Sequence, residues 1–299
     1  MKTRFAPLSA LLAAALYALN APLSKLLLQD VPPSMMAACL YLGAGLGMLI
    51  LGLVRRASGH ASREKPLSRH DLPYVAGMIA LDVAAPILLM LGISRTSPEN
   101  ASLLNNFEIV ATSLIALLLF RERISRRLWL AIGLIVLSSA MLSIEDASHL
   151  SLSTGSVYVL LACCCWGLEN NCTRTLSGAD PQQIVVVKGF GSGTGALIVA
   201  LIAGEALPPA HLALPALGLG FVAYGLSIFF YVYAQRYLGA ARTSAYYAAA
   251  PFIGVLLSLL IFRQWPGALF FAALAIMILA TVLTPLDSAA TEQEASHGT

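Results

Sequence analysis

Residues 98–127 read PENASLLNNFEIVATSLIALLLFRERISRR, and this stretch decides the fold of the chain. It is long enough to cross a membrane, it carries a glutamate at its centre, and it returns later in altered form. The echo is residues 240–264: at a constant shift of 142 residues, FRE at 120–122 aligns with FRQ at 262–264. A span that recurs within one chain predicts an internal repeat, which has to be recognised before any local pattern is interpreted.

The repeat extends well beyond that stretch. The shift of 142 also places Leu72-Pro73 on Leu214-Pro215. A second shift, of 149 residues, lays YALN at 17–20 on WGLE at 166–169. The seven-residue difference between the two shifts falls in the polar, basic loop Arg55–Asp71. The chain is therefore expected to contain two copies of one unit.

The composition is that of a membrane protein. Hydrophobic residues make up 58% of the chain and charged residues 11%, against roughly 45–50% and about 25% in an ordinary soluble domain. A bilayer core of about 30 Å requires about 20 apolar helical residues. The candidate spans are residues 7–28, 34–54, 72–93, 98–120, 128–144, 154–176, 181–203, 212–235, 240–262 and 266–286. We predict an all-α membrane protein with ten transmembrane helices and almost no sequence left for a soluble domain.

Lysine and arginine predict the orientation of these helices, because cytoplasmic loops retain positive charge. With the N-terminus inside, 14 basic residues lie in cytoplasmic segments and three lie outside. Both termini are then cytoplasmic, in a multi-pass protein of the cell (inner) membrane. Each repeat has five spans, an odd number, so the second repeat is inverted relative to the first. The expected units are residues 1–147, residues 148–286 and a disordered cytoplasmic tail at 287–299.

Neither the net charge nor the cysteines indicate another class of protein. The net charge of +3 is spread over several loops, without the clustered basic face of a nucleic-acid binder. The five cysteines all lie within expected spans, where free cysteine packs as a small hydrophobe. No disulfide framework, metal site or cofactor is predicted.

Polar residues at mid-depth mark the candidate site in the first repeat. Tyr17 and Asn20 share one face of the first span, Asp82 lies near the middle of the third, and Asn105 and Glu108 share one face of the fourth. A charged carboxylate at a helix centre costs about 2.5–3.5 kcal/mol on insertion scales, so such residues usually face a cavity or a partner. For Tyr17 and Asn20 the alternative role is an ordinary helix contact. For Glu108 the alternative is a protonated carboxyl that is hydrogen-bonded to Asn105 or to Asp82.

The counterparts in the second repeat are more aromatic. They are Trp166, Glu169 and Asn170 on the sixth span, Tyr224 on the eighth, and Tyr246 and Tyr247 on the ninth. Such rings can accept an apolar side chain or a cation over their faces, although aromatic residues at helical spacing are also common in packed cores. Lys188 on the seventh span has two interpretations: its amine extends to the cytoplasmic edge, or it has a functional role.

Prolines and glycines predict how the backbones bend and pack. A proline removes a backbone donor and frees the carbonyl four residues earlier. The freed carbonyls are those of Ala18, Asp82 and Tyr247, opposite Pro22, Pro86 and Pro251. Closely spaced glycines at 43–47 and 189–195, in the second and seventh spans, predict close helix packing.

Several of these features together resemble the drug/metabolite transporter superfamily, and more narrowly its ten-helix EamA-type members. They are the inverted five-helix repeat, FRERI at 120–124 with its echo FRQ, AAAP at 248–251, and Trp166-Gly167. The resemblance covers nearly the whole chain. It implies a basket of ten helices with a substrate cavity between the halves, worked by alternating access. Members that resemble this chain export amino acids, including aromatic ones, other small metabolites or cationic drugs.

The leading hypothesis is a secondary transporter that exports amino acids or related small metabolites, with its site at mid-depth between the repeats. Asp82, Glu108 and Glu169 are the candidate proton or ammonium sites, Asn20, Asn105 and Asn170 the hydrogen-bonding groups, and Tyr17, Trp166, Tyr224, Tyr246 and Tyr247 the lining of the pocket. The expected partners are a small-molecule substrate and membrane lipid. A monomer is expected, because fused repeats supply within one chain the pairing that a dimer would provide.

Three alternatives stay open. One is a multidrug or cation exporter of the same fold, and another is a passive channel. The third is an intramembrane enzyme such as a lipid or prenyl transferase, which would need clustered carboxylates for a metal, or a nucleophile with its base. The sequence has neither a DDxxD-like run nor a histidine within an expected span, so we expect no enzyme.

Overall fold

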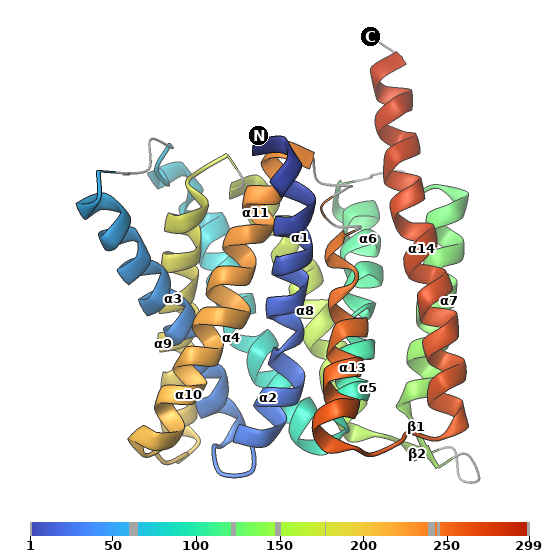
Figure 1. The fold of residues 1–299 in the computed structure, drawn as a ribbon, viewed down its shortest axis with the longest axis horizontal. Helices are drawn as coiled ribbons and strands as arrows, with labels where there is room; N and C mark the ends of the chain where they lie inside the picture. Colours follow the sequence, from blue (N-terminus) through green and yellow to red (C-terminus); the bar gives the residue numbers. More distant parts are fainter. Residues whose placement is uncertain are drawn as a thin grey trace.

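A computed structural model describes residues 2–59, 65–120, 124–146, 151–176, 178–238, 243 and 246–297 of the protein (Figure 1). Residues 121–123 of the FRERI motif lie outside this part of the chain. The first repeat contributes α1 (Lys2–Ala18), α2 (Asn20–Leu27), α3 (Pro33–Ala57), the 3₁₀ turn η1 (Arg69–Asp71), α4 (Leu72–Arg95), α5 (Pro98–Leu104), α6 (Phe107–Phe120), α7 (Arg126–Ser143) and the strand β1 (Ile144–Asp146). The second contributes β2 (Ser151–Leu152), α8 (Thr154–Leu176), α9 (Pro181–Ile202), α10 (Ala210–Gly220), the π-helical turn η2 (Phe221–Leu226), α11 (Ser227–Leu238), α13 (Ala250–Phe262) and α14 (Ala268–His297).

Each of the ten expected spans corresponds to one or more of these helices. For the ninth span, residues 240–262, the corresponding helix is α13. Six continuous stretches of the described chain have the length and apolar composition needed to cross a membrane. They are Ala6–Leu27, Pro33–Ala57, Arg69–Arg95, Arg126–Ser143, Pro181–Ile202 and Ala210–Tyr231. Among the other expected spans, the fourth is divided into α5 and α6 by Asn105-Asn106, and α8 carries the polar residues Glu169 and Asn170. The spans that carry most of the candidate polar residues are therefore also the less regular or more polar ones.

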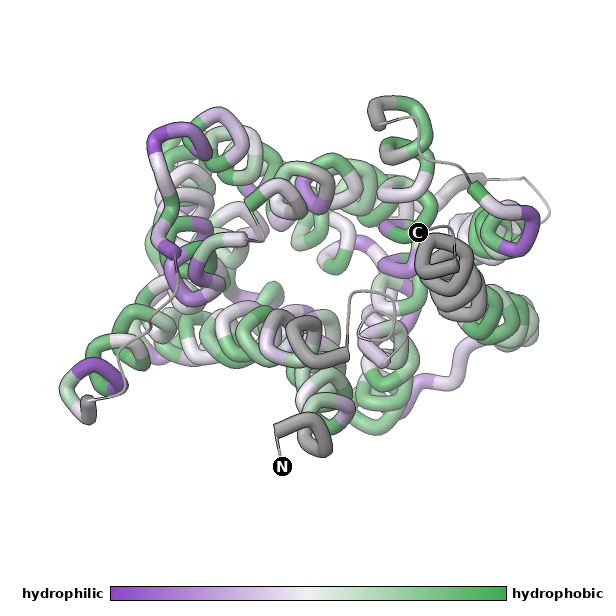
Figure 2. The backbone as a smooth tube through the Cα atoms, turned by 90° about the horizontal axis from the view of Figure 1, so that it is seen from above, coloured by the Kyte–Doolittle hydropathy of each residue, from purple (hydrophilic) through white to green (hydrophobic). Residues whose placement is uncertain are grey.

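The two repeats interlock. The most extensive contacts pair α4 with α8, α3 with α9, α14 with α7, and α1 with α11, and each pair takes one helix from each repeat. The start of α1 and the end of α14 lie on one face of the bundle, and the β1–β2 connection lies on the opposite face (Figure 1). Seen from above, the helices surround the middle of the molecule (Figure 2). The fold is all-α, as predicted, with two inverted five-helix repeats.

The bends expected from proline occur in part. Helix α1 ends at Ala18 and α2 begins at Asn20, so the interruption opposite Pro22 is confirmed. Pro251 lies in the first turn of α13, after turn residues at 248–249. Pro86, in contrast, lies inside α4, which continues as one helix to Arg95.

Glycines bring α3 and α9 into backbone contact. A Cβ atom added at Gly189 would lie 2.4 Å from the Gly45 nitrogen and 2.8 Å from the Tyr41 carbonyl oxygen. At Gly45, an added Cβ would lie 2.9 Å from the nitrogen of Phe190. Only residues without a side chain permit this approach. The packing role predicted for both glycine runs is confirmed, and the contact joins the two repeats.

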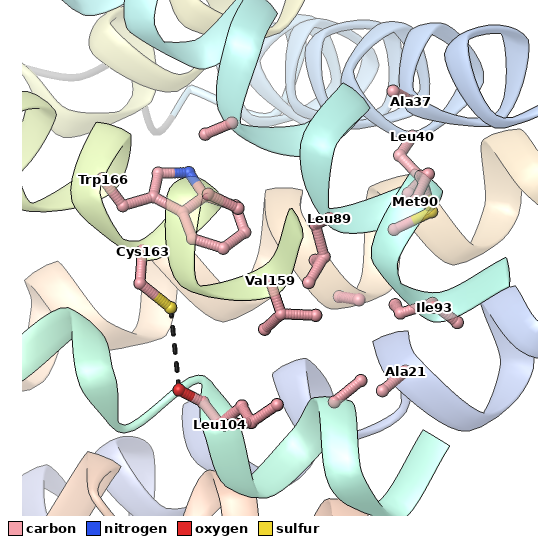
Figure 3. Close-up of a cluster of buried hydrophobic side chains, with 14 of the residues drawn as sticks. Ala21, Ala37, Leu40, Leu89, Met90, Ile93, Leu104, Val159, Cys163 and Trp166 are labelled. Carbon is pink, nitrogen blue, oxygen red and sulfur yellow. Dashed lines mark hydrogen bonds between the residues drawn. The ribbon is translucent and has the colours of Figure 1, made fainter. Parts of the chain in front are cut away.

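The main hydrophobic core extends over most of the helices, and the part drawn in Figure 3 lies where α3, α4, α5 and α8 meet. Val159, Cys163 and Trp166 of α8 pack there near Leu89 of α4, and the Cys163 thiol lies 3.7 Å from the carbonyl oxygen of Leu104. Cys39 is also buried in this core, as predicted for a packing residue, whereas Cys164 is exposed. The core therefore supports the mid-depth residues of α4 and α8 from one side.

Helices α7 and α14 form a pair at the edge of the bundle (Figure 1). The Ser138 hydroxyl of α7 donates a hydrogen bond to the carbonyl oxygen of Ala273 in α14 at 2.8 Å. The fifth and tenth expected spans therefore pack against each other at the periphery of the fold.

Two features differ from the sequence-based expectation. Residues Ile144 and Leu152 pair in a two-stranded antiparallel connection between the repeats, where only a loop is expected. Helix α14 continues to His297, through the segment 287–297 for which we predict disorder. Alanine and glutamate favour a helix, and extending an existing helix avoids the cost of nucleating a new one.

Candidate functional site

A cluster of three charged side chains lies at mid-depth between α4, α8 and α9. The Lys188 amine is 2.9 Å from Asp82 Oδ2 and donates a hydrogen bond to Glu169 Oε1 at 3.0 Å. Asp82 is 0% exposed, Glu169 2% and Lys188 8%. The Tyr41 hydroxyl of α3 donates to Asp82 Oδ1 at 3.0 Å. We call Asp82, Glu169 and Lys188 the charge cluster.

The charge cluster resolves the two interpretations of Lys188. The amine does not extend to the membrane edge, because it is buried between two carboxylates from different repeats. Separating one of these charges from its partners would leave it uncompensated in a medium of low dielectric constant. The signal available in the sequence was the position of Lys188 within a hydrophobic span, between VVV and GFG.

A second polar group joins α6 to α8. The side-chain amide of Asn170 donates hydrogen bonds to Glu108 Oε1 at 2.6 Å and to the Thr112 hydroxyl at 3.3 Å. Glu108 and Asn170 are both partly exposed, unlike the carboxylates of the charge cluster. Glu108 is therefore a mid-depth carboxylate that, unlike Asp82 and Glu169, keeps some access to the space between the helices.

Tyrosine rings and an asparagine form the third group. The Asn20 amide donates to the Tyr224 hydroxyl at 3.0 Å. The Tyr17 ring lies 5.9 Å from the rings of both Tyr224 and Tyr247, and the Tyr41 ring lies 5.1 Å from that of Tyr224. These separations are typical of stabilising aromatic pairs. The group links α1, α2 and α3 of the first repeat to the second repeat.

The two repeats hold related contacts in different chemical forms. At the shift of 149, Asn20 aligns with Glu169, and at the shift of 142, Asp82 aligns with Tyr224. The neutral Asn20–Tyr224 hydrogen bond and the charged contact from Glu169 through Lys188 to Asp82 thus occupy equivalent places. Lys188 itself aligns with Cys39. The mid-depth region is symmetric in position and asymmetric in charge.

A small pocket, with room for about one water molecule, adjoins the tyrosine group. Tyr17, Asn20 and Asn105 line it, with Ser102 and residues of α13. The pocket lies where the α1–α2 interruption, the α5–α6 interruption and the start of α13 come together. The structure thus brings three of the predicted substrate-binding residues to one concave site.

Of the other predicted residues, Tyr246 faces outward, and Trp166 packs in the hydrophobic core close to Tyr41. The Tyr246 side chain is 38% exposed, whereas its neighbour Tyr247 packs on Tyr17 and Tyr231. Consecutive helical residues point in different directions, so only one of the pair can face the centre. Trp166 is buried in the main hydrophobic core (Figure 3). Ser102 and Tyr41, which the structure adds to the site, gave no signal in the sequence beyond their place in a span.

Two interlocked, inverted five-helix repeats with polar side chains at mid-depth define a multi-pass membrane protein of the transporter class. A family model for the EamA-like transporter family matches residues 4–144 and again residues 153–285. The chain belongs to the EamA-like transporter family. It is therefore a membrane transporter of small molecules, and its family indicates no enzyme.

Individual relatives agree with this assignment. An uncharacterized transporter of Methanothermobacter thermautotrophicus is 26% identical to this chain over 280 residues, which cover 88% of this chain and 81% of the relative. A solved crystal structure of a protein superposes with a TM-score of 0.65 at 20% identity, covering 94% of this chain and 96% of that one. The second comparison supports the fold.

Proposed function

We propose that the protein is a secondary transporter that exports amino acids or related small metabolites from the cytoplasm by alternating access. The observation that carries the proposal is the charge cluster, in which Lys188 joins carboxylates from both repeats at mid-depth. Buried ionisable groups are costly within a membrane and are a common mark of substrate or ion pathways. Contacts between repeats at that depth are the ones that change when one repeat moves against the other.

The roles of the individual residues follow from their partners. Asp82 and Glu169 already hold the Lys188 amine, so we assign them to the contact between repeats. Glu108, partly exposed and bonded to Asn170, is the carboxylate that exchanges a proton or attracts a cationic group. Tyr17, Tyr224 and Tyr247 line the path of an apolar side chain.

Transport by a carrier is tested by counterflow. Purified protein is reconstituted into proteoliposomes that are preloaded with one unlabelled amino acid. The radiolabelled form of that amino acid is then added outside. The measurement is repeated for a panel of amino acids and at two pH values. We expect transient, saturable accumulation of at least one label above its equilibrium level. Uptake that rises linearly with concentration and gains nothing from preloading would contradict a carrier and favour a channel.

Replacing Glu108 with glutamine is expected to lower the counterflow rate about tenfold and to weaken its dependence on pH. The change removes the negative charge and keeps the shape of the side chain, and a hydrogen bond to a charged group contributes about 1.5–3 kcal/mol. Asp30→Asn is the matched control, because Asp30 is an exposed carboxylate in the α2–α3 loop. Equal rates and pH profiles in Glu108→Gln and wild type would remove Glu108 from the mechanism.

A multidrug or cation exporter is the second candidate function. The tyrosine group favours it, because Tyr17, Tyr224 and Tyr247 present several rings to one region, and aromatic faces attract organic cations. Adding a lipophilic quaternary cation to the counterflow panel separates the two functions. In either case we propose a monomer in the cell (inner) membrane with both termini in the cytoplasm, and with residues 1–147 and 148–286 as the two repeats.

A further inference from the structure

Helix α13 is separated from its neighbours in the chain by a break at each end. It begins after the turn at 248–249, and Pro251 in its first turn has no N–H to donate to the residues before it. It ends at Phe262, and the linker 263–267, which is not helical, connects it to α14. With 13 residues it is about 20 Å long, shorter than the bilayer core of about 30 Å. Both ends of α13 therefore have the properties of hinges.

Helix α13 packs against α5 and α2, and we call this contact the seam. The three helices lie towards the face that carries the β1–β2 connection (Figure 1). Within the described part of the chain, no hydrogen bond or ion pair joins α13 to α5 or α2. Helix α2, in contrast, is fixed to the end of α4, because the Lys25 amine donates to the carbonyl oxygens of Ile93 and Thr96 at 2.6 and 2.8 Å. The seam is therefore held by packing alone.

The seam also buries polar atoms that lack partners. Within the described residues, neither Ser102 Oγ nor Asn105 Oδ1 has a hydrogen-bond partner, although both atoms are buried. A Cβ added at Gly254 would lie 2.8 Å from Ser102 Oγ, so α13 and α5 are in close contact there. Leaving a buried polar atom unpaired is costly. Water would satisfy both atoms if α13 moved away, so the closed seam carries a penalty that opening removes.

We infer that α13 is a gate, which turns about its two ends and moves away from α5 and α2. The inference rests on the proposed function and assigns the closure of one side of the carrier to one helix. Tyr17 and Asn20 line the small pocket together with Ala250 and Gly254 of α13. Moving α13 therefore uncovers these two residues of the candidate site towards the face that carries the β1–β2 connection.

A disulfide across the seam tests the gate directly. A Cβ added at Gly254 would lie 3.1 Å from Ser102 Cβ, slightly less than the separation of about 3.5–4.5 Å in disulfides. The double variant Ser102→Cys, Gly254→Cys is therefore expected to form a bridge after a small adjustment, which the loss of free thiols verifies. We expect oxidation to abolish counterflow and a reductant to restore it. The two single variants are the controls, and their rates are expected to be equal before and after oxidation.

A second test depends on the unpaired hydroxyl. Ser102→Ala removes it and makes the closed seam more stable, so we expect a higher unfolding temperature and slower counterflow. Ser139→Ala is the matched control, because Ser139 Oγ is also buried without a partner among the described residues but belongs to the peripheral helix α7. It should raise the unfolding temperature and leave the rate unchanged. Ser138→Ala breaks a bond to Ala273 and should lower the unfolding temperature.

A third measurement reports opening without any substrate. Ser102→Cys in sealed proteoliposomes is treated with a membrane-impermeant maleimide, and the wild type, with its five native cysteines, gives the baseline. We expect labelling above that baseline, because the thiol becomes accessible whenever α13 moves away. Ser139→Cys, buried in the α7–α14 pair, is expected to remain at the baseline.

Three outcomes would overturn the inference. They are full counterflow with the disulfide formed, a lower unfolding temperature in Ser102→Ala, and labelling of Ser102→Cys no higher than that of the wild type. Failure of the gate and failure of the carrier give different results. Labelling of Ser102→Cys without counterflow of any solute supports the gate and contradicts the proposed function. Counterflow that persists in the oxidised double variant refutes the gate and leaves the carrier function in place.

Discussion

Lys188→Met is expected to lower the free energy of unfolding by about 3–5 kcal/mol, the usual effect of removing one partner from a buried ion pair. The reason is electrostatic. The variant leaves Asp82 and Glu169, which are 0% and 2% exposed, close together without their cation. Methionine has a similar length, so lost packing volume contributes little. The effect is measured by thermal unfolding in detergent, with the loss of monodisperse protein as the signal.

Two companion variants identify the cause. The triple variant Asp82→Asn, Glu169→Gln, Lys188→Met removes all three charges and is expected to recover most of the lost stability, while counterflow stays low. Tyr224→Phe breaks the equivalent neutral contact with Asn20 and should cost only about 1–3 kcal/mol. If Lys188→Met unfolded at the wild-type temperature, the amine would contribute nothing to holding the repeats together.

Gly189→Ala is expected to give the second large effect, a severe loss of folded protein. The added Cβ would lie 2.4 Å from the Gly45 nitrogen and 2.8 Å from the Tyr41 oxygen. These are backbone atoms of α3 and cannot rotate away, so the two helices must separate. Overpacking of a well-packed core costs about 1–3 kcal/mol and sometimes more. The yield of monodisperse protein in size-exclusion chromatography measures the change.

Gly133→Ala in α7 is the matched control for this variant. No atom of the described chain outside its own helix backbone and chain neighbours lies within 4 Å of a Cβ added at Gly133. Alanine also favours a helix over glycine. The control should therefore express as well as wild type. Equal yields from Gly189→Ala and wild type would show that α3 and α9 do not need their close approach.

Most of the architecture could be predicted from the sequence, because a membrane simplifies the problem. Spans such as 34–54 and 181–203 are long apolar runs, and backbone polar groups inside a bilayer must be satisfied within a helix. The interruption at Asn105-Asn106 was not predicted, since no proline or glycine lies there. Asparagine side chains compete for backbone hydrogen bonds, but neighbouring helices decide whether the helix opens.

The depth of the site residues in the membrane could be predicted from the sequence, but the contacts between their side chains could not. Hydropathy placed Asp82, Glu169 and Lys188 inside spans, because position along a helix follows from counting residues. Which charges meet depends on how α4, α8 and α9 rotate and cross, and this is set by packing between distant parts of the chain. The same limit explains why the sequence could not separate Tyr246 from Tyr247.

The uneven charge of the two repeats has a consequence for the ancestry of the chain. Lys188 aligns with Cys39 and Asp82 with Tyr224, so two copies of the first repeat, assembled as an inverted homodimer, would bury two aspartates and no amine. The first repeat has become dependent on the second for the cation beside Asp82, whereas Glu169 and Lys188 of the second repeat already pair with each other. Cut between β1 and β2, the first half would need the unlike second half, and not a second copy of itself, to neutralise Asp82.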